Sequence, residues 1–135
     1  MAQATNYMET EVLSGLLNGT AIQLSAAKPY IALLTSAPDE NGVATEVAGG
    51  GYARVQIGGT GQGNFSNNGE GVAVNDAEFR WNDCTTDWGT ITHVGLFDEA
   101  TNGQMLIYGT LQQPIVLETG DIFKVPANGF TISID

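Results

Sequence analysis

Basic residues are scarce in this chain. Lysine and arginine together account for four of the 135 residues, against fifteen aspartates and glutamates, which gives a formal net charge of −11. The four bases, Lys28, Arg54, Arg80 and Lys124, are scattered along the sequence. A surface this acidic repels phosphate groups, so we expect the protein to bind neither nucleic acid nor an anionic membrane surface.

Cysteine and histidine occur once each, as Cys84 and His93. A single cysteine excludes an internal disulfide framework, and the acidic neighbours of Cys84 argue against a reactive thiol. We therefore expect a buried, unreactive Cys84. His93 lies within an apolar segment and is expected to be a hydrogen-bonded residue of the core or of an interface. With no second histidine or cysteine, a structural zinc site is not expected.

Targeting and membrane signals are also missing. Residues 1–5 carry no cationic region followed by an apolar core, so we expect no signal peptide. No apolar run approaches the ~20 residues that a membrane-spanning helix requires. These features predict a protein that is assembled in a cytosol and is not embedded in a membrane.

Sequence motifs of catalysis are absent as well. The glycine-rich segment 46–51 lacks the Lys and Ser/Thr of a phosphate-binding loop, and no Gly-x-Ser-x-Gly motif occurs. Two acidic pairs, Asp76 with Glu78 and Asp83 with Asp87, invite a hydrolase or calcium interpretation, but neither matches the EF-hand spacing. In so acidic a chain we expect these pairs to be part of the solvated surface. The alternatives are that they bind a divalent ion weakly or act as the carboxylates of a hydrolase. We expect no enzyme, no catalytic residue, no cofactor and no metal.

What the chain does contain is a strong hairpin pattern over residues 88–111. Both predicted strands carry apolar residues on both faces, which indicates central strands buried on both sides. The expected pairs that share a face are Ile91 with Phe97, Val94 with Leu96, Met105 with Ile107, and Leu106 with Tyr108. Asn102 and Gly103 supply the positive φ angles that the connecting turn requires.

The remaining sequence predicts further short strands with turn signals every 8–12 residues. Residues 6–135 are expected to form one domain of mainly β structure, an antiparallel β-sandwich or jelly-roll-like fold with one short N-terminal helix. Residues 58–71 are expected to be an exposed loop, and the last two strands to pair as a closing hairpin. The predicted strands are 30–35, 52–57, 72–74, 77–81, 114–117, 122–125 and 130–134.

The N-terminal region is predicted to consist of a flexible arm over residues 1–5 and a helix at about 7–18. Asn6 is the expected N-cap, and Gly19 is the expected stop. The apolar residues at helical spacing are Met8, Val12, Leu13, Leu16 and Leu17. We expect this stripe to plug one end of the sandwich, and docking on a neighbouring subunit is the alternative.

Several segments in this order resemble a family of small virion proteins of tailed bacteriophages, described as head-decoration or tail-fibre-like proteins. These segments are 30–38, 45–54, 88–98, Gly120-Asp121 and 125–132. The resemblance covers nearly the whole chain and departs at Asn128-Gly129, where the family more often has Gly-Gly. It implies a structural, non-enzymatic virion protein and brings no catalytic residue with it.

Within that family, we expect a capsid cement protein on the outside of the head. A receptor-binding fibre is usually long and repetitive, whereas this chain is short and has no internal repeat. The alternative is a tail or tail-fibre component, an adhesin that would bind carbohydrate through Tyr52, Trp81 or Trp88. The virion is therefore the expected location, on the capsid surface or, in the alternative, on the tail.

The expected partners are the major capsid protein or other virion proteins, together with further copies of this chain. A homotrimer is expected because a closed cyclic oligomer matches the threefold positions of a capsid. The residues expected to form protein interfaces are those of the arm and the helix stripe: Met1, Ala2, Gln3, Ala4, Thr5, Leu13, Leu16 and Leu17.

Overall fold

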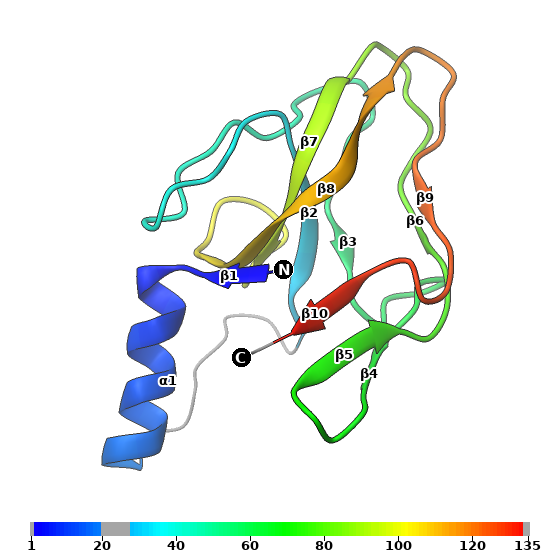
Figure 1. Ribbon diagram of the computed structural model, residues 1–135. Coiled ribbons are helices and arrows are strands. Elements are labelled where there is room, and N and C mark those ends of the chain that lie inside the picture. Colours follow the sequence, from blue (N-terminus) through cyan, green and yellow to red (C-terminus); the bar gives the residue numbers. More distant parts are fainter. Residues whose placement is uncertain (1, 20–27, 134–135) are drawn as a thin grey trace.

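The computed structural model describes residues 2–19 and 28–133 (Figure 1). In this part of the chain the protein is mainly β, with antiparallel sheets and one helix in a sandwich-like arrangement, which confirms the predicted fold class. The elements are β1 (Ala2–Ala4), α1 (Asn6–Asn18), β2 (Tyr30–Leu34), β3 (Val55–Gln56), β4 (Phe65–Asn67), β5 (Val72–Asn75), β6 (Phe79–Arg80), β7 (Gly89–Phe97), β8 (Met105–Leu117), β9 (Lys124–Val125) and β10 (Thr131–Ser133).

The predicted hairpin forms the middle of the largest sheet. The order of strands in this sheet is β1-β8-β7-β2-β3, and each strand runs antiparallel to its neighbours. Asn102 and Gly103, with φ angles of 54° and 73°, make the turn between β7 and β8 as expected. Burial is less complete than predicted, because Ile91, Phe97 and Leu106 are buried, whereas four other predicted core residues are half-buried. These four are Val94, Leu96, Ile107 and Tyr108.

Two irregularities in the hairpin change which residues share a face. The pairing of β7 with β8 shifts between Ile91 and His93, and again between Leu96 and Phe97. Ile91 therefore packs in the same cluster as Val94 and Leu96, and Met105 packs with Phe97 and Tyr108. The predicted groupings of Ile91 with Phe97 and of Met105 with Ile107 are wrong, because β8 has three more residues than β7 at the first shift and one more at the second, which breaks the strict alternation.

Two smaller sheets, β10-β5-β4 and β6-β9, cover one face of the large sheet. Large aromatic side chains fill the space between the layers. The Phe79 ring lies 5.7 Å from that of Phe65, and the Trp81 ring lies 5.1 Å from that of Phe123. Both Phe79 and Trp81 are fully buried, so this seam is the main core of the protein.

The predicted closing hairpin is wrong, because its two strands join different sheets. β9 pairs with β6 and β10 pairs with β5. The buried Asn75 holds the intervening loop: its amide donates to the carbonyl of Pro126 at 2.9 Å, and its side-chain oxygen accepts from the backbone of Phe130 at 2.8 Å. These bonds fix the loop against β5, which separates the two strands.

Two further strand assignments differ from the sequence prediction. Residues 65–67, expected within an exposed loop, form β4 and pair with β5. The segment 114–117, expected as a separate strand, continues β8 without interruption. Pro114 is tolerated there because this part of β8 lies beyond β1, so its backbone nitrogen is not needed by a neighbour on that side.

Residues 2–4, which were predicted as part of a flexible arm, form the edge strand β1 in the structure. β1 pairs with β8 in the register Ala2↔Gly109 to Ala4↔Ile107. The edge of β8 has unpaired backbone N–H and C=O groups. The backbone of residues 2–4 pairs with them, and this pairing does not depend on which side chains the segment carries. Met1, predicted as an interface residue, lies outside the described residues.

Thr5 joins this strand to the helix. It is 1% exposed, and its hydroxyl donates to the carbonyl of Met105 at 2.6 Å while accepting from the backbone of Met8 at 3.3 Å. Thr5 is therefore the N-cap of α1, in place of the predicted Asn6. Gly19 ends the helix in the left-handed region, with φ at 69°, as expected.

Replacing Thr5 with alanine is expected to lower the free energy of unfolding by about 1–2 kcal/mol, because one hydroxyl both caps α1 and satisfies a buried carbonyl. Urea denaturation followed by tryptophan fluorescence measures this change. Thr10→Ala is the matched control, because the Thr10 hydroxyl is exposed and bonds only within the helix, to the carbonyl of Asn6. Equal stability of the two variants would contradict this role of Thr5.

Candidate interaction surface

The apolar stripe of α1 faces away from the protein core. Leu13, Leu16 and Leu17 are 55%, 76% and 71% exposed, and no residue of the helix is buried. Figure 1 shows α1 standing off the sheets, attached through β1. The expectation that the stripe plugs an end of the sandwich is therefore wrong, because β1 places the helix beyond the edge of the large sheet. Among the described residues, no helix has the length and apolar character needed to cross a membrane.

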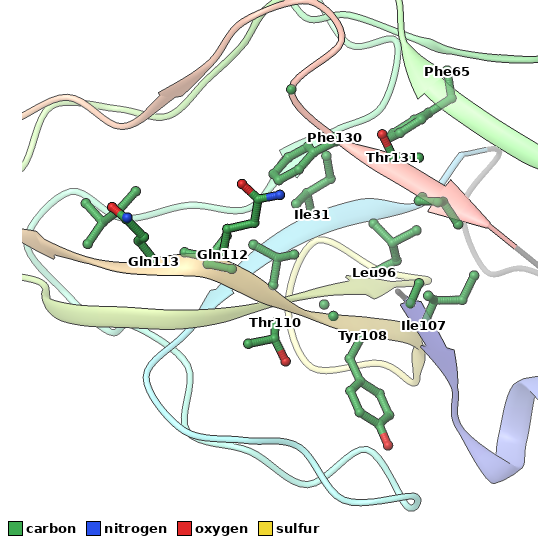
Figure 2. Close-up of a pocket in the computed structure, with 18 of the residues that line it drawn as sticks. Ile31, Phe65, Leu96, Ile107, Tyr108, Thr110, Gln112, Gln113, Phe130 and Thr131 are labelled. Atoms are coloured by element: carbon green, nitrogen blue, oxygen red, sulfur yellow. The ribbon is translucent and has the colours of Figure 1, made fainter.

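An open groove of about 750 Å³ lies between β8 and β10. Figure 2 shows Ile31, Leu96, Ile107 and Phe130 around this space, whereas Tyr108 projects from the opposite side of β8. The groove exists because the small sheets cover the large sheet incompletely near the first half of β8. Apolar side chains of the inner face are consequently accessible from solvent there.

The groove and the second half of α1 share an unusual lack of charge. Within residues 2–19 and 28–133, the side chains that line the groove include no Asp, Glu, Lys, Arg or His. Residues 12–18 of the helix are also uncharged, and its acidic residues Glu9 and Glu11 lie nearer its start. In a chain of net charge −11, these are surfaces on which another acidic protein meets little local repulsion.

A partly buried polar cluster is centred on Arg54. Its guanidinium bonds to both carboxylate oxygens of Glu46, at 2.8 and 2.9 Å, and to the carbonyls of Glu99 and Asn102, each at 2.8 Å. It also lies 3.7 Å from the centre of the Phe97 ring. These contacts fasten the turn between β7 and β8 to the loop before β3. The cluster therefore has a structural role.

Tyr52 completes this cluster. Its hydroxyl donates to Glu46 at 2.5 Å and accepts from the backbone of Leu33 at 3.0 Å. Burial, followed by the hydrogen bond to the Glu46 carboxylate, raises the pKa of Tyr52 far above its ordinary value. The phenol therefore stays protonated and serves as a link between the loop and β2.

The aromatic residues proposed as a carbohydrate platform are not available for stacking. Trp81 and Trp88 are 1% and 5% exposed. The Trp88 nitrogen donates to the carbonyl of Gly50 at 2.9 Å, and Tyr52 packs edge-on against the Trp88 ring. Trp81 and Trp88 therefore belong to the core and cannot form a carbohydrate platform, whereas the half-buried Tyr52 packs against that core.

Two of the four acidic residues singled out in the sequence, Asp76 and Asp87, bond to nearby loops. Asp76 accepts from the backbone of Asn64 at 2.9 Å. Asp87 accepts from the backbone and hydroxyl of Thr119 at 2.9 and 3.0 Å, and these bonds lower the pKa of its carboxyl. Within residues 2–19 and 28–133, no three His, Cys, Asp or Glu side chains come together as a possible metal site.

Cys84 is buried, as predicted, and burial followed by the nearby acidic residues raises the pKa of its thiol. His93 is half-buried on β7, and its Nδ1 lies 2.8 Å from the hydroxyl of Thr92. Neither residue lines the groove between β8 and β10. Neither residue therefore belongs to the candidate surface.

The predicted interface residues fall in two places. Ala2, Gln3 and Ala4 form β1, with Ala2 at the margin of the groove, and Thr5 is buried beneath the start of the helix. The leucines at 13, 16 and 17 form the exposed stripe. Sequence reasoning missed the groove itself. One signal was available: residues 105–117 contain no charged side chain in a strongly acidic chain.

Comparison with known proteins extends the resemblance found in the sequence. The family described as podophage GP4 fiber I protein gp80 matches residues 3–133. No match was found among curated proteins. Because the family match spans nearly the whole chain, it includes the helix stripe and every strand that lines the groove. The chain belongs to this family of phage fibre proteins and is a structural protein of a phage virion.

Proposed function

We propose that this protein is a subunit of a bacteriophage tail fibre. The observation that carries the proposal is the match to a fibre protein family over residues 3–133. This match supports the tail-fibre alternative better than the capsid cement expected from the sequence. The short, non-repetitive chain that favoured cement is equally suited to a globular module within a fibre.

The surface of the protein supports a role in contacts between proteins. The two uncharged apolar features, the helix stripe and the groove, are suited to other virion proteins or to further copies of the chain. The net charge of −11 disfavours contact with nucleic acid or anionic lipid.

We further propose that the protein has no enzymatic activity. The cluster around Arg54, Glu46 and Tyr52 is occupied by internal hydrogen bonds. Asp76 and Asp87 likewise accept bonds from backbone groups of loops. These side chains have structural partners, and neither the cluster nor the carboxylates line the groove.

Location within the virion tests the proposal. Antibody-gold labelling of purified particles is expected to mark the tail, and quantitative mass spectrometry to give a small copy number relative to the major capsid protein. Antibody against the major capsid protein is the matched control for labelling of the head. Label spread over the head at high copy number would overturn the tail-fibre proposal and establish a cement protein.

A further inference from the structure

Two apolar surfaces of this chain are left uncovered by its described residues. One is the stripe of Val12, Leu13, Leu16 and Leu17 on α1, and the other is the groove between β8 and β10. We propose that α1 of one copy docks into the groove of a second copy. This inference deepens the proposed function by naming the contact between fibre subunits, and it rests on that function for its setting in the virion.

The distribution of charge favours a second copy as the occupant. Each copy carries a net charge of −11, so most approaches between two copies are repulsive. Among the described residues that line the groove there is no Asp, Glu, Lys, Arg or His, and residues 12–18 of α1 have none either. Contact through the helix stripe and the groove brings two uncharged surfaces together. The acidic residues of both copies then lie at the edge of the contact.

The dimensions of the two surfaces are compatible. Residues 12–18 span about 10 Å of helix, at 1.5 Å per residue. The groove is open and has a volume of about 750 Å³, so docking would replace the water in it with leucine side chains. Each leucine that becomes fully buried strengthens the association roughly tenfold or more.

The attachment of α1 favours docking on another copy over insertion into its own groove. Thr5 fixes the start of the helix to β8, through its hydroxyl and through its backbone nitrogen, which lies 3.0 Å from the carbonyl of Leu106. The backbone of Asn6 donates to Glu40 at 2.8 Å, and its side chain donates to Asn41 at 3.1 Å. Figure 1 shows the anchored helix pointing away from the sheets. Insertion into its own groove would break these bonds.

The resulting contact is heterologous, because the surface given by one copy differs from the surface it meets on the next. Every copy would donate one helix and offer one groove. Such contacts close into a ring when the rotation between neighbours permits, and otherwise continue as an open chain. A ring would leave no helix or groove unoccupied, which suits a fibre subunit of defined copy number.

Disulfide trapping between separately prepared variants tests the contact. Leu16→Cys and Gln112→Cys are mixed under mild oxidation; Leu16 lies on the stripe, and Gln112 is an exposed residue of the groove. We expect a cross-linked heterodimer. Val43→Cys mixed with Gln112→Cys is the matched control, because Val43 is 66% exposed and lies on neither surface. The natural Cys84 is buried and should not take part.

Sedimentation equilibrium provides the second test. The double variant Leu16→Asp, Leu17→Asp is expected to weaken self-association roughly 100-fold or more, since two leucines leave the contact and two charges enter it. Its melting should stay within a degree or two of the parent at dilution, because both side chains are exposed. Val43→Asp controls for added charge alone.

Failure of the docking proposal can be distinguished from failure of the tail-fibre proposal. A monomeric parent at all accessible concentrations, unchanged association of the double variant, or equal trapping of the Val43 control would each overturn the docking proposal. A double Leu16→Cys, Gln112→Cys chain that closes its own disulfide at high dilution would overturn it in favour of intramolecular docking. Label on the head would overturn the tail-fibre function and leave the measured contact between copies intact.

Discussion

Replacing Phe79 with alanine is expected to lower the free energy of unfolding by about 3–5 kcal/mol. The side chain is 0% exposed and lies between the rings of Phe65 and Phe130, at 5.7 and 6.1 Å. Its removal takes a large apolar group from the seam between the large and small sheets. The surrounding strands belong to different sheets, so they cannot close the cavity by moving together. Urea denaturation at pH 7 measures the loss.

Val43→Ala is the control for this prediction. Val43 is 66% exposed, so its truncation is expected to change stability by less than about 0.5 kcal/mol. Phe79→Leu should fall between the two, because it keeps part of the apolar volume. A Phe79→Ala protein that unfolds within about 1 kcal/mol of the parent would show that this aromatic seam is not the main core.

Replacing Arg54 with alanine is also expected to cost about 3–5 kcal/mol, the range for breaking a buried ion pair by removing one partner. The Arg54 side chain is 6% exposed and that of Glu46 is 23% exposed. Loss of the guanidinium leaves the Glu46 carboxylate without its cationic partner, with the Tyr52 hydroxyl still donating to it, and leaves the carbonyls of Glu99 and Asn102 without the Arg54 donor. It also uncovers one face of Phe97.

Arg80→Ala is the matched control for this variant. Arg80 is 47% exposed, and its guanidinium lies 3.9 Å from Asp83, so its loss should change stability by about 0–1 kcal/mol. The double variant Arg54→Met, Glu46→Met should recover part of the loss, because it leaves no charge behind. If Arg54→Ala were as mild as Arg80→Ala, the cluster would not hold the β7–β8 turn.

The hairpin over 88–111 was predictable because its signals are local. The apolar pattern of both strands and the Asn102-Gly103 turn lie within one short segment. The two shifts in register were not predictable, since a pattern reading assumes strict alternation along each strand. The closing hairpin failed for a different reason: the bonds that separate its strands come from Asn75, more than fifty residues earlier in the chain.

The candidate surface was only partly predictable. The spacing of Leu13, Leu16 and Leu17 predicted an apolar stripe, but that spacing is the same whether the stripe faces its own core or a neighbour. The side chains of Ala2, Gln3 and Ala4 gave no sign that this segment would pair with the edge of β8. The groove joins β7, β8 and β10, so no single segment of the sequence carries its pattern.

The pairing of β1 with β8 has a consequence for synthesis of the protein on the ribosome. Thr5 and its partner Met105 are 100 positions apart, so β1 and α1 emerge long before the strand that anchors them. At roughly 5–20 residues per second, this delay is about 5–20 s. Throughout that time the leucine stripe is presented by an unanchored segment. Neighbouring nascent chains on one messenger would therefore meet the stripe before any of them has completed the large sheet.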